Sequence, residues 1–518
     1  MKTPYRLSSV SLLVLLLLTS SALAENVFRV RLVSDPTSFD WNIAHTDVET
    51  PVMMNIMEGL VEFDTSMKVK PLLAESWTIS PDQKTYTFRL KAGIKWSDGK
   101  VLTANDFAYS WQRLLAPLTA APYASMLYDI EGAEDYNKHK SPDFSQVGIK
   151  AVNATTLQVK LRRPVAYFIQ MLTFWVTFPL RQDIVEKFGP SWPQAGKTVV
   201  LGPFIPVSYR PQSQIVLKRN ENYHGKRPDA DTVIMQIINE DSTALNLFRS
   251  GQLDYARPVN FLELSDMQNT PAYHTAPYYR TCFINVNTSK YPFSLPKVRQ
   301  ALAMGIDRSK LKDVLHHNLE SADSFMSDAL FPQGKNSALA YNPVQAKKLL
   351  LEAVSDPSAL PKIEFFTFAS DENALLAQFI QDQLKKNLGI NVTINMPEFS
   401  MYRTQLDLQS GALYQRCWAA DYADPDTFFS VFTSDSGNNR TSWKSPRYDE
   451  LVNTAKATPN GPDRVKLYKE ALELLLRAEA PITPLYYDSL TYLLNPKIKN
   501  FVINPLNYVF FRDIVFSK

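Results

Sequence analysis

Segments with the patterns of strands and of helices alternate along almost the whole chain, and no linker rich in Gly or Ser divides them. With 518 residues, the chain is too long for one hydrophobic core, so two or more domains are expected. Because no point separates a strand-rich block from a helix-rich block, we expect the chain to cross between domains more than once. The pattern predicts a multi-domain α/β protein.

Individual elements are predicted from hydrophobic periodicity and from signals at their ends. Strands are expected within residues 28–40, 84–100, 155–161, 214–220, 232–238, 281–287, 362–369, 390–396 and 412–418. Helices are expected at 103–115, 183–189, 242–251, 295–307, 374–389 and 462–480. The run at 462–480 is the longest of these helix predictions, and Thr103 is expected to cap the helix that follows it.

The first 24 residues have the pattern of a cleaved signal peptide. Lys2 and Arg6 precede an apolar run at 10–18 that is too short to span a bilayer, and residues 22–24, Ala-Leu-Ala, resemble a cleavage site. A membrane anchor is the alternative interpretation. No cysteine lies near the cleavage site, so a lipoprotein signal is not indicated. We expect a secreted protein whose mature chain begins near Glu25.

The charge balance argues against two classes of partner, and the hydropathy argues against a membrane-spanning segment in the mature chain. Without Lys2 and Arg6, 53 of the 55 basic residues remain against 52 acidic ones. This balance argues against nucleic acid or an anionic membrane as the main partner, because both need a clustered basic excess. No later stretch reaches the length of a transmembrane helix, so the mature chain is not expected to span a membrane.

Sequence motifs for catalysis and for metal binding are absent. The chain has no G-x-S-x-G, no H-E-x-x-H and no G-x-x-x-x-G-K-[ST] motif. His45 and Glu49 have helical spacing, but two ligands make a poor metal site. Neither cysteine has a nearby histidine to activate it as a nucleophile. We therefore predict no metal, no cofactor and no enzymatic activity.

Two cysteines, Cys282 and Cys417, lie in strand-like runs 135 positions apart. Export permits a disulfide between them. In the chain-entropy model, closing so long a loop stabilises a protein by roughly 4–5 kcal/mol. Two buried free thiols remain the alternative from the sequence pattern alone.

Three aspartates stand among aromatic residues in the segment CWAADYADPDTFF at 417–429. A calcium loop starting at Asp421 fails, because the required Gly and Glu positions hold Asp426 and Phe. Asp424 is suited to be an N-cap, Pro425 suits the first helical position, and Asp426 suits the helix dipole. Asp421 precedes this helix, and a buried carboxylate there needs a positive partner. That partner is either an internal Lys or Arg or a charge on a ligand.

An ordered set of motifs covers nearly the whole mature chain. The set comprises Glu75-Ser76-Trp77, Tyr86-Thr87-Phe88, Trp96-Ser97-Asp98-Gly99, Asp106-Phe107 with Ser110-Trp111, Pro122-Tyr123-Ala124-Ser125, and the runs VEKFG, NLFRSGQLD, VRQALAMGIDR and KSPRYDEL. It is similar to the extracellular solute-binding proteins of peptide-importing ABC transporters. The run WAADYADPDTF most resembles their oligopeptide-binding and murein-peptide-binding branch.

The resemblance implies a periplasmic binding protein clamp of two lobes with a hinge and three domains. A signal peptide at 1–24 precedes a discontinuous domain I, which would comprise 25–57, 183–279 and 488–518. Domain II would be an insertion at 58–182, and domain III would form the opposing lobe at 280–487.

The same resemblance implies that the protein would be a periplasmic, monomeric receptor that delivers short peptides to an inner-membrane ABC permease. The family places an aspartate of the W-x-x-D-Y motif, here Asp421, against the ligand ammonium group. Extended segments of the protein are expected to pair with the ligand backbone, and the candidates are the segment around His45 to Asp47 and the strand from Arg416 to Ala419. The implied ligand-binding residues are Asp421, Trp418, Arg416, Cys417, Ala419, Tyr123, Phe399, His45 and Asp47. For Tyr123, Phe399 and Trp418, packing in the core is the alternative. Alternatives are a family receptor for a metal chelate, haem or an oligosaccharide, and a secreted hydrolase.

The chain departs from the family pattern where a peptide C-terminus would bind. The family arginine three residues before the motif tryptophan is replaced by Gln415, and Arg416 is expected to face the other side of the strand. A second family arginine has only Arg403 near its place. A tyrosine near the C-terminal hinge is replaced by Asp488.

The cysteines also differ from the family positions. The disulfide cysteines of the family correspond here to Arg280 and Ala419, two positions before Cys282 and two positions after Cys417. In antiparallel strands these shifts cancel, which leaves Cys282 and Cys417 opposite each other on one face. The resemblance therefore favours the disulfide.

Overall fold

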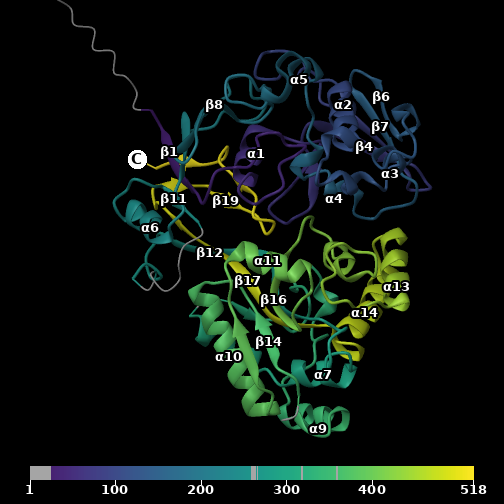
Figure 1. Cartoon of the computed structure of the whole chain (residues 1–518). Coiled ribbons are helices and arrows are strands. Elements are labelled where there is room, and N and C mark those ends of the chain that lie inside the picture. Colours follow the sequence, from purple (N-terminus) through teal and green to yellow (C-terminus); the bar gives the residue numbers. More distant parts are fainter. Residues whose placement is uncertain (1–24, 258–263, 265, 317–318, 358–359, 518) are drawn as a thin grey trace, which may run out of the picture.

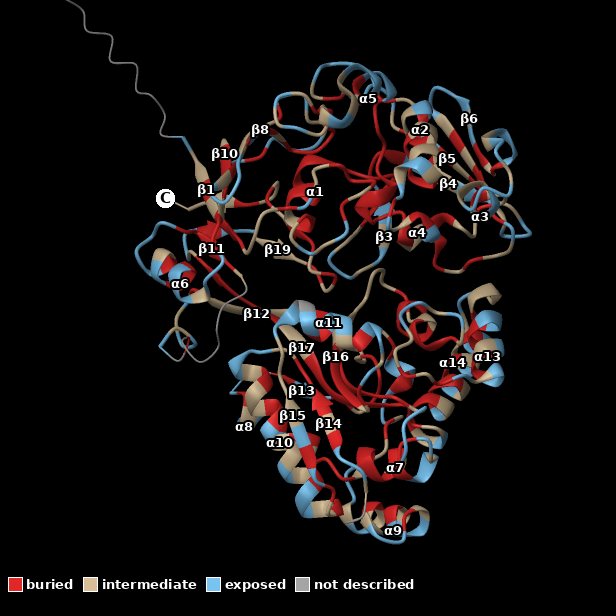
Figure 2. Cartoon of the chain, in the orientation of Figure 1, coloured by how far each residue is buried: buried red, intermediate tan, exposed pale blue. Residues whose placement is uncertain are grey.

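The computed structural model describes residues 25–517 except 258–263, 265, 317–318 and 358–359. The predicted signal peptide at 1–24 lies outside the described residues. The described chain forms two lobes, drawn one above the other in Figure 1. Figure 2 shows buried residues concentrated inside each lobe and exposed residues on the outer helices. The chain has the expected α/β composition, with a large mixed sheet.

One mixed sheet of 11 strands runs through both lobes. Its order is β15 (Val392–Asn395), β14 (Ile363–Phe366), β16 (Leu413–Ala419), β12 (Tyr273–Val286), β17 (Ile482–Leu494), β11 (Tyr255–Ala256), β1 (Val27–Leu32), β10 (Thr232–Ile237), β9 (Gln214–Arg219) and β8 (Phe204–Arg210), with β13 (Glu320–Ser321) paired to β17. A separate four-stranded sheet has the order β4 (Ala74–Ile79), β5 (Thr85–Leu90), β7 (Thr156–Lys160) and β6 (Ile149–Asn153). Three two-stranded sheets pair β2 (Val61–Phe63) with β3 (Val69–Pro71), β18 (Ile498–Lys499) with β21 (Val515–Phe516), and β19 (Val502–Ile503) with β20 (Val509–Phe510).

The helices pack around these sheets. They are α1 (Thr50–Ile56), α2 (Ala104–Leu115), α3 (Ala133–Asn137), α4 (Phe168–Met171), α5 (Gln182–Phe188), α6 (Asp241–Arg249), α7 (Pro296–Met304), α8 (Leu311–Leu315), α9 (Pro343–Ala353), α10 (Asp371–Leu388), α11 (Phe399–Asp407), α12 (Asp426–Phe429), α13 (Pro446–Ala457) and α14 (Pro462–Glu473).

Local sequence explains where several helices begin and end. At α2 the N–H of Thr103 donates to the Asp106 carboxylate over 2.8 Å, as a capping box requires. The 18-residue helix α10 ends at Leu388 and is capped by Gly389, whose φ of 77° suits a residue without Cβ. The prediction that 462–480 is the longest helix was wrong. There α14 ends at Glu473, and the chain continues as a π-helical turn toward Pro481, which cannot extend a helix.

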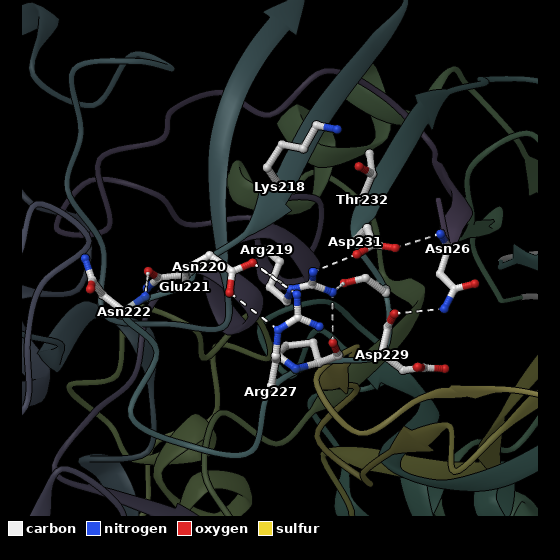
Figure 3. Close-up of polar contacts among 12 residues, drawn as sticks. Asn26, Lys218, Arg219, Asn220, Glu221, Asn222, Arg227, Asp229, Asp231 and Thr232 are labelled. Carbon is white, nitrogen blue, oxygen red and sulfur yellow. Dashed lines mark hydrogen bonds and ion pairs between the residues drawn. The ribbon is translucent and has the colours of Figure 1, made fainter. Parts of the chain in front are cut away.

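Charged side chains tie the start of β1 to the loop between β9 and β10 (Figure 3). Arg219 at the end of β9 pairs with Asp231 over 2.7 Å and with Glu221 over 3.0 Å. Asp231 accepts a hydrogen bond of 2.8 Å from the backbone N–H of Asn26. This network fixes the first described residues against the sheet.

Buried side chains form separate clusters that correspond to the two lobes. One cluster draws on residues within 28–255 and 492–514 together with Tyr279. Two other clusters lie within 282–486. The chain therefore starts in one lobe, enters the other near 280 and returns near 490.

Strands β12 and β17 connect the lobes as an antiparallel pair. Their register shifts between Pro277 and Thr281, where residues 278–280 lie opposite Asp488 alone. Arg280 bridges this irregularity with an ion pair of 2.7 Å between its Nη1 and Asp488 Oδ2. The connection between the lobes thus contains a local interruption of the sheet ladder.

Candidate ligand-binding site

A cavity of about 1060 Å³ lies between the lobes, a volume at the upper end for ligand sites. Tyr123 reaches it from the lobe that contains the four-stranded sheet. Most of the remaining lining comes from β12, β16, β17, α11 and the N-terminal end of α10.

The edge of β16 is open where it lines the cavity. β12 pairs with β16 along its whole length, but β14 pairs with it only at Leu413 and Tyr414. Along 415–419, no strand of the described chain pairs with this second edge, and all five of these residues line the cavity. The Gln415 carbonyl accepts a hydrogen bond from the Tyr402 hydroxyl. Beyond Gln415, N–H and C=O groups that no strand pairs form a template for another extended chain.

Asp421 follows this open edge and lines the cavity. Its backbone N–H donates to Thr427 Oγ1 over 3.1 Å. Its carboxylate makes no hydrogen bond or ion pair to any residue that the structure describes. Burial raises the pKa of Asp421 to about 7, and the charge of Asp47 contributes to the increase. The cation expected from the sequence is therefore not an internal Lys or Arg of the described chain.

The other two aspartates of this segment have internal partners. Asp424 pairs with Arg464 through two contacts of 2.8 and 2.7 Å, and Asp426 accepts from the Tyr422 hydroxyl over 2.8 Å. Helix α12 begins at Asp426, so Pro425 holds the cap position predicted for Asp424. The Asp424 carboxylate still accepts from the Asp426 N–H over 2.9 Å. Local sequence could not reveal the distant arginine.

Three predicted aromatic residues line the cavity: Tyr123, Trp418 and Phe399. Tyr123 packs edge-on against Phe174 with ring centroids 5.0 Å apart. The indole N–H of Trp418 donates to the backbone oxygen of Thr427 over 2.9 Å. Phe399 is 53% exposed, which argues against a role in core packing alone.

The segment from His45 to Asp47, which we expected to be extended, has a bend at Thr46 and a turn at Asp47. The Glu49 carboxylate accepts from the N–H groups of Thr37 and Thr46 over 2.6 and 2.8 Å, which curls the chain ahead of α1. His45 and Asp47 are exposed, and the cavity lining of the described chain does not include them. His45 and Glu49 do not share a helix face.

Arg416 is a buried cation in the cavity wall. It is 8% exposed and donates to Asn285 Oδ1 and to the backbone oxygen of Asn438, both over 3.2 Å. No carboxylate of the described residues lies within 4.0 Å of its guanidinium. Burial lowers the pKa of Arg416 to about 10. Gln415 also lines the cavity. Gln415 and Arg416 are therefore both part of the site, although their side chains were predicted to lie on opposite faces of the strand.

The disulfide between Cys282 and Cys417 is present, with Cα atoms 3.9 Å apart. The two cysteines are direct partners in the register of β12 and β16, and so are Arg280 and Ala419. The compensating shifts predicted from the sequence are thus confirmed. The bridge crosslinks the central strand that connects the lobes to the strand that borders the cavity.

Within the described residues, no helix combines the length and apolarity needed to cross a bilayer. Nor do those residues contain a group of three or more His, Cys, Asp and Glu side chains placed to hold a metal ion.

Comparisons with known proteins agree with this arrangement. The dipeptide-binding protein DppE of Bacillus subtilis (strain 168) is 32% identical over 499 residues, which cover 94% of this chain and 91% of DppE. The probable deoxycholate-binding periplasmic protein YgiS of Escherichia coli (strain K12) is 30% identical over 508 residues, covering 95% and 93%. The Haemophilus influenzae OppA structure in complex with RPPGFSPFR matches 96% of this chain and 99% of its own, with a TM-score of 0.80 and 26% identity. The model of bacterial extracellular solute-binding proteins, family 5 (middle), matches residues 68–440, so this chain belongs to that family.

Proposed function

We propose that this protein is a non-enzymatic receptor that encloses short peptides between its lobes and delivers them to an inner-membrane ABC permease. The observation that carries this proposal is the Asp421 carboxylate, which lies half-buried beside an open strand edge and has no cation partner among the described residues. A peptide supplies both missing partners. Its ammonium group pairs with Asp421, and its backbone pairs with 415–419.

This mode of binding tolerates many sequences. Backbone hydrogen bonds do not depend on side-chain identity, and water can bridge side chains to the walls of a large cavity. Trp418, Cys417, Ala419, Tyr123 and Phe399 would contribute surface to the enclosed ligand. His45 and Asp47 would act from outside the lining, Asp47 through its charge on Asp421.

Relatives support a peptide ligand and also name a different one. DppE is described as dipeptide-binding, and the similar OppA structure contains a peptide. YgiS is described as probably deoxycholate-binding. A steroid acid has no ammonium group to pair with Asp421, so the charge of this site favours a peptide. The same argument disfavours haem and an oligosaccharide.

The proposed domain division is that of the sequence analysis. Domain I comprises 25–57, 183–279 and 488–518, domain II comprises 58–182 and domain III comprises 280–487. Separate buried clusters support two lobes, and the register shift in the connecting strands lies beside the proposed boundaries. We assign the hinge to this place. Export by the signal peptide at 1–24 would place a monomeric receptor in the periplasm.

Removal of the Asp421 charge tests the proposed function directly. Asp421→Asn keeps the shape and removes the charge, and losing one member of such a pair costs about 2–5 kcal/mol. Affinity for a free-amine peptide should therefore fall roughly 30- to 5,000-fold by calorimetry. An N-acetylated peptide should bind wild type poorly and respond much less to the substitution.

Asp435→Asn provides a matched control, because this aspartate is exposed on the same lobe. It should bind both peptides as wild type does. If wild type binds acetylated and free peptides equally, or if the effects of acetylation and substitution simply add, Asp421 does not hold the amine and the proposal fails.

A further inference from the structure

The open edge of β16 separates two walls of the cavity. Successive side chains of a strand point to opposite faces of the sheet. Cys417 packs with the buried cluster that includes α10, whereas Trp418 packs with the cluster that includes α13 and α14. Arg416 lies over Phe283 of that second cluster, 5.7 Å from the ring centroid. Residues from both faces line one cavity, so the cavity extends around the strand edge.

The wall on the Arg416 face has an excess of positive charge. Arg403 and Arg440 line the cavity with Arg416, and both lower its pKa further through charge repulsion. Arg440 is compensated by Asp407 at 2.8 Å. Arg403 and Arg416 have no ion pair within the described chain. A buried guanidinium without an anion is costly, so this wall is suited to receive one.

The wall on the α10 face has an excess of negative charge. Glu372 lines the cavity there, and its hydrogen-bond partner is the neutral hydroxyl of Tyr486. Burial raises the pKa of Glu372, the nearby Asp488 adds to this increase, and the charge of Arg280 opposes it. Arg280 is already paired with Asp488. Glu372 also stabilises the first turn of α10, but that role does not require it to border a ligand cavity.

We infer that the site selects peptides with opposite charges on neighbouring side chains, an acidic one toward Arg416 and a basic one toward Glu372. The inference rests on the proposed function, because it needs an extended ligand paired with 415–419. In such a ligand, adjacent side chains point to opposite faces of the sheet. One therefore meets the arginine wall and the next meets the glutamate wall.

Tetrapeptides with free amino ends test this selection by calorimetry. The series is tetra-alanine with Glu, Gln or Lys placed singly at the second or at the third position. At one position Glu should bind about tenfold or more tighter than Gln, as a charged hydrogen bond allows. At the neighbouring position Lys should show the corresponding advantage. Equal affinities throughout, or both preferences at one position, would overturn the inference.

Substitutions in each wall test which wall causes which charge preference. Arg416→Gln should remove the preference for Glu and leave that for Lys, and Glu372→Gln should do the reverse. Arg403→Gln, at an exposed position, should weaken the Glu preference without any risk to folding. If amidating the peptide C-terminus abolishes the effect of Arg416→Gln, this arginine binds the chain end, and the side-chain selection is wrong.

The binding of tetra-alanine distinguishes a failure of this inference from a failure of the proposed function. If tetra-alanine binds and charge has no effect, only the selection fails. If no peptide of the series binds, the proposed function fails, and the selection fails with it.

Discussion

Binding of an ammonium group at Asp421 must change the protonation of that residue. Its carboxyl pKa of about 7 reflects burial and the charge of Asp47, with no cation to oppose them. Between the ordinary value of 3.8 and about 7, the folded protein therefore retains a proton that the unfolded chain releases. This contribution to stability is complete at low pH and is lost as pH rises through about 7. A ligand ammonium has the opposite preference, because it favours the ionised carboxylate.

Proton release is the measurable consequence at this residue. At pH 6, calorimetry of a free-amine peptide in buffers of different ionisation enthalpy should show close to one proton released per peptide. Affinity should rise from pH 5 toward 7 and fall again above the α-amino pKa of about 8. Asp421→Asn should release no proton. A wild-type protein with constant affinity between pH 5 and 7 would contradict the assignment.

Strand β16 shows which features of an element can be predicted from sequence. Its position followed from the local alternation of apolar and polar residues. Its register with β12 followed from the family resemblance, because the shifts of the two cysteines from the family positions cancel in antiparallel strands. The ion pair between Asp424 and Arg464 could not be predicted from the sequence, because it joins residues 40 positions apart. The bend at Thr46 and the turn at Asp47 were missed because the side chain of Glu49 organises them through its hydrogen bonds.

The disulfide of this element should contribute measurable stability. It closes a loop of 135 residues, which in the chain-entropy model corresponds to about 5 kcal/mol. The double variant Cys282→Ala with Cys417→Ala should lower the free energy of unfolding by that order in denaturant titrations. Unreduced, denatured wild type should show no free thiol. Two free thiols per chain, or equal stability of the two proteins, would contradict the crosslink.

At the scale of the whole molecule, the lobes meet beside the residue that we assign to the ligand amine. Tyr422, next to Asp421, stacks on Tyr167 of the other lobe with ring centroids 5.0 Å apart and an interplanar angle of 14°. Arg464 lies 5.9 Å from the Tyr167 ring centroid. A ligand held at Asp421 thus adjoins a contact between lobes. Ligand binding and closure are expected to favour each other.

Small-angle scattering should therefore show a smaller radius of gyration with saturating peptide than without it.

An aromatic pair contributes about 0.5–1.5 kcal/mol. Tyr167→Ala should accordingly destabilise the closed form and weaken peptide binding about two- to tenfold, although this ring does not line the cavity. Tyr341→Ala, an exposed tyrosine remote from the contact, should behave as wild type. An unchanged scattering profile at saturation, with binding confirmed by calorimetry, would exclude closure. Unaltered affinity in Tyr167→Ala would show instead that closure does not depend on this stacked pair.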